Sequence, residues 1–230
     1  MRPSKVVRAV NWRHAAGELV LIVAGILIAL AISDWNEERV QREQEIALLQ
    51  EIRYGLETDL KALESNLEIF IQAANEMDEL QSLLRSRSSY DPSMDRLFGA
   101  VYGIRMTNLN TVAYETLKSV GLQSISNPEL RAGIATVFDN YYDRLLGEQD
   151  IDMQVTANVM RPYYLQHFRD LKFGESATPM DYEEILDDTY FLNIVDYRLA
   201  VLRSNQLDSY GLTAVEIRKV LQLLNEEINR

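Results

Sequence analysis

The sequence predicts an all-α protein in which one N-terminal transmembrane helix continues into a long helix of an elongated extracytoplasmic helical bundle. Three observations predict this architecture. An uncharged apolar run lies near the N-terminus, and apolar residues then recur every seven positions for about five heptads. No alternating run typical of a β-strand extends beyond a few residues, and no β-hairpin signal is apparent. A chain of 230 residues is long enough for one such domain and its anchor.

The apolar run covers residues 19–32, with the sequence LVLIVAGILIALAI. Fourteen residues are short for a membrane span, which needs about 20. Trp12 and Trp35 extend the run on either side, and they lie about 35 Å apart in a helix, close to the thickness of a bilayer. The sequence therefore predicts a transmembrane helix over residues 15–34, with Trp12, Arg13 and Trp35 as anchors at the two membrane interfaces.

The distribution of charge predicts the orientation of this helix. Residues 1–33 contain four basic residues and one acidic residue, for +3, whereas residues 34–230 contain 19 basic and 34 acidic residues, for −15. Basic residues favour the cytoplasmic side. We therefore expect a cytoplasmic tail (1–14) and an extracytoplasmic domain (35–230). An acidic body also argues against nucleic acid as a partner.

Two other interpretations of the apolar run stay open at this point. A basic N-terminal region, an apolar core and the Ala29-Leu30-Ala31 sequence are compatible with a cleaved signal peptide. The long basic region and Glu18 at the start of the run argue against cleavage. The third interpretation is a buried core helix of a soluble protein, which gives no reason for the two tryptophans or the charge asymmetry.

Within the predicted span, small residues occupy one face and a carboxylate opens the apolar run. Gly17, Gly25, Ala29 and Ser33 share a helical face, and Gly25 and Ala29 form a small-xxx-small pair that allows close helix packing. This face predicts self-association, although glycine and alanine are also common in spans that stay alone. Glu18 is a candidate functional residue because ionisable groups are costly in a membrane, or a group that pairs near the interface.

Residues 12–37, WRHAAGELVLIVAGILIALAISDWNE, resemble the N-terminal signature of a family of uncharacterised bacterial single-pass membrane proteins. A weaker similarity to the same family covers residues 111–131, TVAYETLKSVGLQSISNPELR. The resemblance implies an uncleaved anchor in the plasma (inner) membrane of a bacterium, followed by a helical extracytoplasmic domain that faces the periplasm. It implies no activity and no catalytic residue.

The body begins with a helix that we expect to run out of the membrane to about residue 86. A seven-residue repeat places apolar side chains on one face, and a second row four residues later completes a coiled-coil or bundle seam. The first row is Leu49, Leu56, Leu63, Phe70, Met77 and Leu84, and the second is Leu60, Leu67 and Ala74. The opposite faces carry charged residues, including Glu57, Asp59, Lys61, Glu64 and Glu68.

Proline, glycine and capping residues divide the rest of the chain into helices. We expect a turn over 88–92, a short helix to about 105, and a helix over 111–119 that ends at Gly121. Asn127-Pro128 starts a long helix that Pro162 kinks or breaks before about residue 168. A loop over 172–179 precedes the last helices, which Gly211 weakens or interrupts.

Catalytic and metal-binding signatures are missing from the sequence. It has no cysteine, two histidines (His14 and His167), and no phosphate-binding glycine loop or hydrolase motif. We therefore predict no cofactor, no metal site and no enzymatic activity. The acidic pairs at Asp150 and Asp152 and at Asp187 and Asp188 are interpreted as solvated helix ends.

Tyrosines and arginines alternate in the C-terminal half and leave two interpretations open. The aromatic residues are Tyr141, Tyr142, Tyr163, Tyr164, Phe168, Tyr190, Phe191 and Tyr197, and the arginines among them are Arg131, Arg144, Arg161, Arg169 and Arg198. They could line a cleft for an anionic or aromatic ligand. Alternatively, the tyrosines span core and surface of a narrow bundle, with their hydroxyl groups in water.

These observations favour a non-enzymatic scaffold or a binding or sensor module that self-associates through its anchor and its seam. The partners we expect are the lipid bilayer, further copies of this chain and another membrane protein. The alternative is a subunit of an oligomeric membrane channel, in which Glu18 and the small-residue face line or pack the pore.

Overall fold

The structure is a computed structural model that describes residues 12–103 and 105–230, with side chains described from residue 17 onward. The chain divides into two units, residues 1–47 and residues 48–230, which are described in turn. The second unit is called the helical domain below. The predicted tail and the side chains of Trp12, Arg13 and His14 lie outside the described part of the chain.

Helix α1 (Trp12–Arg85) provides the described residues of the first unit and continues into the second. Its length confirms the predicted helix to about residue 86. Arg87, at a φ of 52°, ends it in a left-handed conformation, with hydrogen bonds from Arg87 N to Leu84 O and from Ser88 N to Leu83 O. This is a Schellman motif in which arginine takes the position that glycine usually holds.

In the helical domain, the seven-residue repeat of α1 is the buried face of the helix, as predicted. Its six members are between 0% and 4% exposed, from Leu49 to Leu84. Of the second row, Ala74 is buried, and Leu60 and Leu67 are half-buried against the same core. One member of the predicted charged face is an exception, because Asp59 is only 1% exposed.

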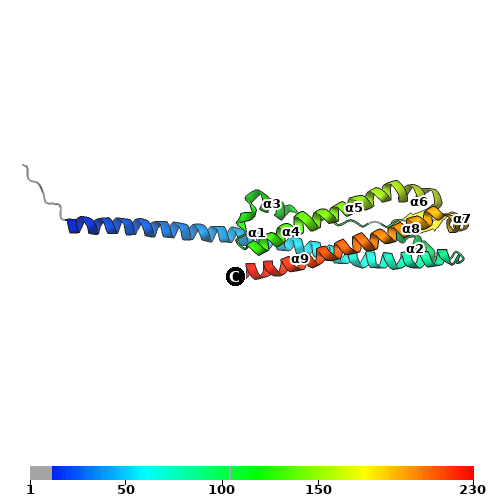
Figure 1. The fold of residues 1–230 in the computed structure, drawn as a ribbon, viewed down its shortest axis with the longest axis horizontal. Helices are drawn as coiled ribbons and strands as arrows, with labels where there is room; N and C mark the ends of the chain where they lie inside the picture. Colours follow the sequence, from blue (N-terminus) through cyan, green and yellow to red (C-terminus); the bar gives the residue numbers. More distant parts are fainter. Residues whose placement is uncertain (1–11, 104) are drawn as a thin grey trace, which may run out of the picture. The chain divides into compact units, whose positions relative to one another are not determined.

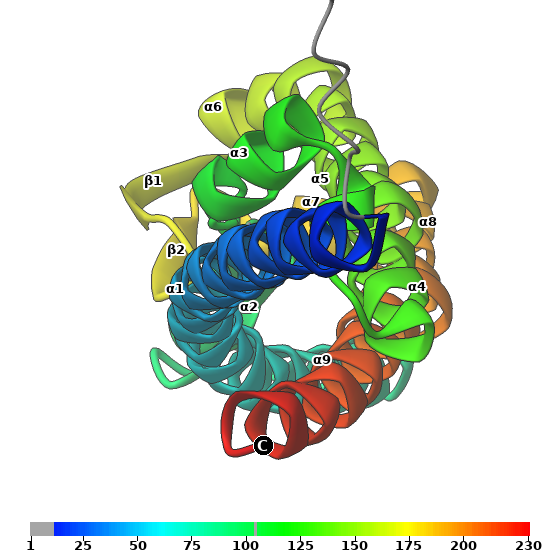
Figure 2. The same cartoon turned by 90° about the vertical axis from the view of Figure 1, so that its left-hand side faces the viewer.

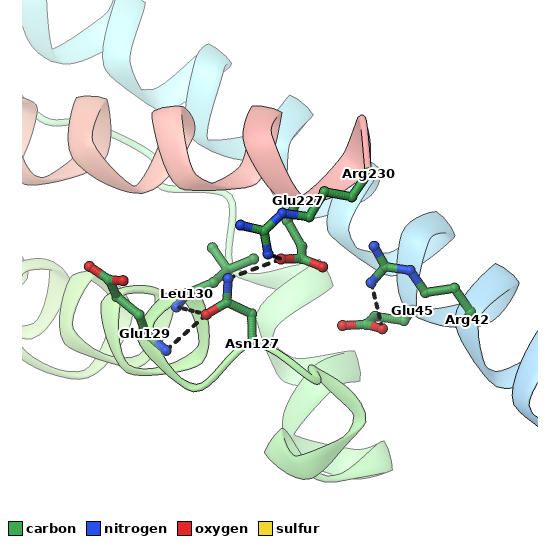
Figure 3. Close-up of polar contacts among 7 residues, drawn as sticks. All are labelled: Arg42, Glu45, Asn127, Glu129, Leu130, Glu227 and Arg230. Atoms are coloured by element: carbon green, nitrogen blue, oxygen red, sulfur yellow. Dashed lines mark hydrogen bonds and ion pairs between the residues drawn. The ribbon is translucent and has the colours of Figure 1, made fainter.

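Three short helices and a 3-10 turn follow: α2 (Met94–Val101), α3 (Val112–Val120), η1 (Leu122–Ser124) and α4 (Pro128–Thr136). Helix α2 ends four residues before the predicted position. Gly121, at a φ of 108°, ends α3 as predicted. The Asn127 side chain accepts hydrogen bonds from the backbone N–H groups of Glu129 and Leu130, so the predicted cap is confirmed (Figure 3).

The predicted break at Pro162 does not occur. Helix α4 passes through a π-helical segment, η2 (Val137–Tyr142), into α5 (Asp143–Val155), and a second one, η3 (Thr156–Met160), precedes α6 (Arg161–His167). Pro162 therefore lies in the first turn after a π-helical segment. The wider π turn accommodates a residue that has no N–H to donate and whose ring would crowd a regular preceding turn.

Residues 168–179 form an antiparallel β-hairpin, whereas the sequence predicted a loop over 172–179 and no hairpin. The strands are β1 (Phe168–Lys172) and β2 (Ser176–Pro179), and Phe168 pairs with Pro179. Gly174, at a φ of 70°, provides the turn, and a bulge lies between Arg169 and Lys172. Strands this short, with a bulge in one of them, have no clear alternation for sequence reasoning to detect.

The hairpin packs against α2 at Gly99. A Cβ atom on this residue would lie 2.3 Å from the Ser176 backbone nitrogen, so only glycine allows strand β2 to approach the helix this closely.

The chain ends with α7 (Tyr182–Asp187), α8 (Thr189–Val201), the π-helical segment η4 (Leu202–Gln206) and α9 (Leu207–Ile228). The predicted interruption at Gly211 is wrong, because α9 passes through it and the irregular turn lies earlier, at η4. Figure 1 shows α4 and α5 beside α9, and Figure 2 shows the helices of this domain end-on.

Candidate functional site

The first candidate is the apolar segment, defined here as residues 17–33 of α1. Among the described residues, α1 is the one helix that is long and apolar enough to cross a membrane, with a mean hydropathy of 2.1 in its most apolar window. None of that window is buried, unlike the core helix of a soluble protein. An exposed apolar surface of this length is typical of a membrane-spanning helix and also of a signal sequence near an N-terminus.

The predicted packing residues all lie on the surface of this segment. Gly17, Gly25, Ala29 and Ser33 are exposed, and a Cβ atom added to either glycine would meet no described atom within 4 Å. Glu18 is also exposed, beside the same face, and Trp35 is 65% exposed. The regular helix therefore presents the small residues as a row open to a neighbouring helix.

The second candidate is a buried ion pair in the helical domain. Arg198 on α8 and Asp152 on α5 are each 3% exposed and are paired through Arg198 Nη1 and Asp152 Oδ1. Arg198 also donates to the carbonyl oxygens of Gly103, at 2.7 Å, and Val101, at 3.3 Å. The interpretation of Asp152 as a solvated helix end is therefore wrong, because its carboxylate neutralises a buried guanidinium.

Polar side chains extend from this pair across the centre of the domain. Gln149 Oε1 accepts from the Thr107 backbone N–H at 2.6 Å, and Thr107 Oγ1 donates to the Tyr210 hydroxyl at 3.1 Å. Among the described residues, Asp152 Oδ2 and Gln149 Nε2 are buried without a hydrogen-bond partner. This polar layer fixes the segment between α2 and α3 against α5 and α9.

Asp59, the buried member of the predicted charged face of α1, is a separate buried carboxylate with its own hydrogen-bond partners. Asp59 accepts hydrogen bonds from Asn110 N, at 3.0 and 3.1 Å, from Asn110 Nδ2, at 2.7 Å, and from the Tyr142 hydroxyl, at 2.6 Å. Burial, followed by the charge of Asp59 and this hydrogen bond, raises the pKa of Tyr142 far above its ordinary value. Asp59 therefore connects α1 to the segment before α3 and to η2.

Of the two interpretations of the aromatic residues, the structure favours the one in which they span core and surface: Tyr142, Tyr163, Tyr164, Phe168 and Phe191 are buried, whereas Tyr190 and Tyr197 are exposed. Tyr164 stacks on Phe168 with ring centroids 4.4 Å apart, and Tyr163 stacks on Phe191 at 5.4 Å. Phe98 of α2 also packs against Phe168 at 5.3 Å. These rings pack against one another between the hairpin and the helices.

The tyrosine hydroxyl groups of this core bond to protein atoms rather than to water alone. Tyr163 donates to Asp188, and Tyr164 donates to the Phe98 carbonyl oxygen at 2.8 Å. Burial raises the pKa of Tyr163 and Tyr164, and the hydrogen bond to Asp188 adds to this effect for Tyr163. Of the five arginines predicted to lie among the aromatic residues, only Arg198 is buried.

The other acidic pair has two separate roles. Asp187 is exposed and forms an ion pair with Arg87 at 2.8 Å. Asp188 caps α8 by accepting from the Tyr190 backbone N–H. In the described part of the chain, no group of three metal-binding side chains comes together.

Comparison with known proteins gives one match, to a family without an assigned activity. The model of a family of unknown function, DUF6090, matches residues 18–202. This chain belongs to the DUF6090 family. No curated protein and no solved structure matches it significantly. The family match covers most of the apolar segment and most of the helical domain of this DUF6090 protein, and it agrees with the resemblance to an uncharacterised family.

Sequence reasoning missed two buried ionic centres of this DUF6090 protein, Asp59 and the pair of Asp152 with Arg198. Asp59 follows Leu56 by three positions and precedes Leu63 by four, which places it on the seam side of α1. That spacing is a signal for its burial. The spacing of Arg198 and Asp152 along the chain, 46 residues, contains no comparable signal.

Proposed function

We propose that this DUF6090 protein is a non-enzymatic, single-pass membrane protein whose helical domain acts outside the cytoplasm as a scaffold or binding module. One observation carries this proposal. Helix α1 has an exposed apolar segment and then, without interruption, a seam that forms part of the core of the helical domain. The charge asymmetry favours a cytoplasmic N-terminus in the bacterial inner membrane.

The buried ionic groups support a structural rather than a catalytic role for this domain. Asp59 and Arg198 bind backbone groups and neighbouring side chains through their polar atoms, and both are closed off from solvent. A catalytic group must instead reach a substrate.

Self-association of this protein would use the apolar segment. The first row of the seam of α1 is at most 4% exposed, and Leu60 and Leu67 of the second row are half-buried against the same core, so the chain's own helices cover the seam and leave little surface for a second copy. The row formed by Gly17, Gly25, Ala29 and Ser33 is open, and small residues let two helices approach closely in lipid. We therefore assign homo-oligomerisation to this row.

The test compares two substitutions in the full chain with a bacterial two-hybrid assay in the inner membrane. Gly25→Leu places a large side chain on the row, and Val23→Leu enlarges a side chain on the opposite face as the control. We expect Gly25→Leu to reduce the association signal severalfold and Val23→Leu to leave it unchanged. Equal signals from the two variants would contradict assembly through this row.

Topology is tested by a C-terminal alkaline phosphatase fusion to the full chain. The enzyme is active only outside the cytoplasm, so we expect high phosphatase activity. Activity of a cytoplasmic reporter at the same position, without phosphatase activity, would reverse the proposed orientation.

A channel subunit is the second candidate, favoured by the exposed carboxylate of Glu18 beside the small-residue row. A channel requires a stable ring of four or more subunits in mild detergent and an ion flux into liposomes that Glu18→Gln reduces. A monomer or dimer under these conditions would contradict the channel and leave the scaffold as the better account.

A further inference from the structure

A small, partly open cavity of about 30 Å³ lies in the helical domain, beside the buried Arg198. It is bordered by α1, the C-terminal side of α2, the hairpin turn and η4. Apolar side chains form most of its wall, including Ile69, Phe70, Ala73, Met77 and Leu202.

Three polar side chains line the same space. Gln206 is only 6% exposed, and its amide group makes no hydrogen bond with any described residue. The exposed Arg105 likewise forms no ion pair or hydrogen bond in the part of the chain that the structure describes. Arg198 is the third, and its charge is balanced by Asp152. The cavity is therefore lined by the Gln206 amide and the Arg105 guanidinium, neither of which has a hydrogen-bond partner among the described residues.

Two glycines line this cavity beside Arg105. A Cβ atom on Gly103 would lie 3.2 Å from the Gly174 Cα atom, so the segment after α2 and the hairpin turn are in close contact there. A Cβ atom on Gly174 would lie 3.9 Å from Arg105 Nη2. The guanidinium of Arg105 therefore lies beside the hairpin turn, at the border of the cavity.

The size and chemistry of the space limit what can occupy it. A volume of about 30 Å³ holds roughly two water molecules, or the few non-hydrogen atoms of a small organic ion. Phosphate and sulfate are too large and too highly charged for one free guanidinium in a mainly apolar wall. A carboxylate fits the donors of Arg105 and Gln206, and a short alkyl group fits the apolar wall.

We infer that this cavity is a binding site for a small monocarboxylate of the acetate class. The carboxylate accepts hydrogen bonds from Arg105 and from the Gln206 amide, and the alkyl end contacts Ala73 and its apolar neighbours. This inference rests on the binding role proposed above and gives that role a ligand class.

Isothermal titration calorimetry of the full chain in nanodiscs tests the site, with sodium formate, acetate and butyrate as ligands and sodium chloride as the control salt. We expect saturable binding of acetate, weaker binding of butyrate because the space is small, and no binding of chloride. Arg105→Gln removes the unpaired charge and should raise the Kd for acetate at least about tenfold. Ala73→Leu fills the cavity without changing any charge and should abolish binding.

Arg161→Gln is the matched control, because Arg161 is an exposed arginine of the same domain that also has no partner among the described residues and lies away from the cavity. It should change the Kd by less than about twofold. Circular dichroism verifies that each variant is folded. Absence of acetate binding, equal binding of chloride, or equal losses in Arg105→Gln and Arg161→Gln would overturn the inference.

The outcome is distinguishable from failure of the proposed assembly. Association that depends on Gly25, together with no acetate binding, would overturn the monocarboxylate site alone. Acetate binding without association would support the site and contradict homo-oligomerisation.

Discussion

The two parts of α1 arrange their apolar residues in different ways. Over residues 17–33 apolar side chains surround the whole helix and are exposed, whereas from Leu49 onward they follow one face and are buried. The two parts also differ in their ionisable groups. Glu18 is the one ionisable residue of the apolar segment, while the helical domain contains buried carboxylates and a buried guanidinium.

This comparison teaches that one regular helix can suit two different surroundings if the pattern of its apolar side chains changes along its length. The apolar segment relies on its surroundings for stability, because its own chain covers none of it. The helical domain relies on contacts within the chain, including ionic ones that are stable only when complete. A change that weakens contacts within the chain should therefore destabilise the helical domain and leave the apolar segment unchanged.

Alkaline pH should have the largest effect, and it should act on the helical domain alone. Burial raises the pKa of Tyr142, Tyr163 and Tyr164 above the ordinary value of 10.0, and burial with a hydrogen bond to Asp95 raises the pKa of Tyr90 to about 12. The unfolded chain then loses these protons first. Stability is therefore complete below about pH 10 and falls as the pH rises further, by up to about 1.4 kcal/mol per pH unit for each fully buried tyrosine.

The measurement is circular dichroism of the full chain in detergent between pH 8 and pH 12, together with tyrosinate absorbance. The apolar segment contains no tyrosine, so its share of the helical signal should persist after the domain unfolds. Tyrosinate absorbance that appears near pH 10 while the domain stays folded would contradict the assigned pKa shifts.

Loss of the buried ion pair should have the next largest effect. Arg198→Met leaves Asp152 buried without its counter-charge, and we expect it to reduce the free energy of unfolding by about 3–5 kcal/mol. Urea denaturation followed by tyrosine fluorescence measures this change. The double variant Arg198→Met/Asp152→Leu removes both charges and should recover part of the loss, and a double variant that is less stable than the single one would contradict this account.

The same substitution in the two parts of α1 should give different results. Leu63→Ala leaves a cavity in a side chain site that is 0% exposed and should cost the domain about 2–5 kcal/mol in its free energy of unfolding. Leu27, which is 60% exposed, is the matched position in the apolar segment. Leu27→Ala should change the urea midpoint of the domain within error, and a loss similar to that of Leu63→Ala would show that the two parts unfold together.

Removal of the α4 cap should have the smallest of these effects. Asn127→Ala deprives the Glu129 and Leu130 N–H groups of their acceptor and should cost about 1 kcal/mol. Asn127 Nδ2 also donates to Glu227 at 2.9 Å, and Arg230 binds the same carboxylate (Figure 3). Asn127→Ser restores a capping acceptor without the Glu227 contact. If it is as unstable as Asn127→Ala in urea, the contact with Glu227 rather than the cap is responsible.

Local patterns in the sequence predict the parts of the fold that depend on neighbouring residues. The repeat from Leu49 to Leu84, the cap at Asn127 and the end of α3 at Gly121 each depend on a few positions close in the chain. The exposed apolar segment is equally local, because its composition alone makes it unlike the rest of the chain.

The missed features depend on residues that are far apart. Arg198 meets Asp152 across 46 residues and Gly103 across 95, and Asp59 meets Tyr142 across 83. From the sequence alone, a charged residue is expected to be exposed to solvent unless its partner is known. The cavity beside Gln206 depends on two glycines in separate segments and on an irregular helical turn, none of which has a local signature.

Irregular helical turns account for two wrong boundaries. One π-helical segment precedes Pro162 and another precedes α9, and each adds a residue to a helical turn. Neither segment contains a proline or glycine that would reveal it in the sequence. Proline and glycine predict the end of a helix reliably only when the neighbouring turns are regular. Here the neighbouring turns are π-helical, and the helix continues.

The contacts of α1 with the end of the chain constrain the order of events during synthesis. Arg53 binds Asn225 across 172 residues, and Glu64 binds Arg218 across 154, so the first helix made packs against the last one. Until α9 has been translated, the leucines of the seam have no complete cover, and the nascent chain is exposed to aggregation and proteolysis. A premature stop codon at the start of α9 should therefore be nearly as damaging as the loss of the whole domain.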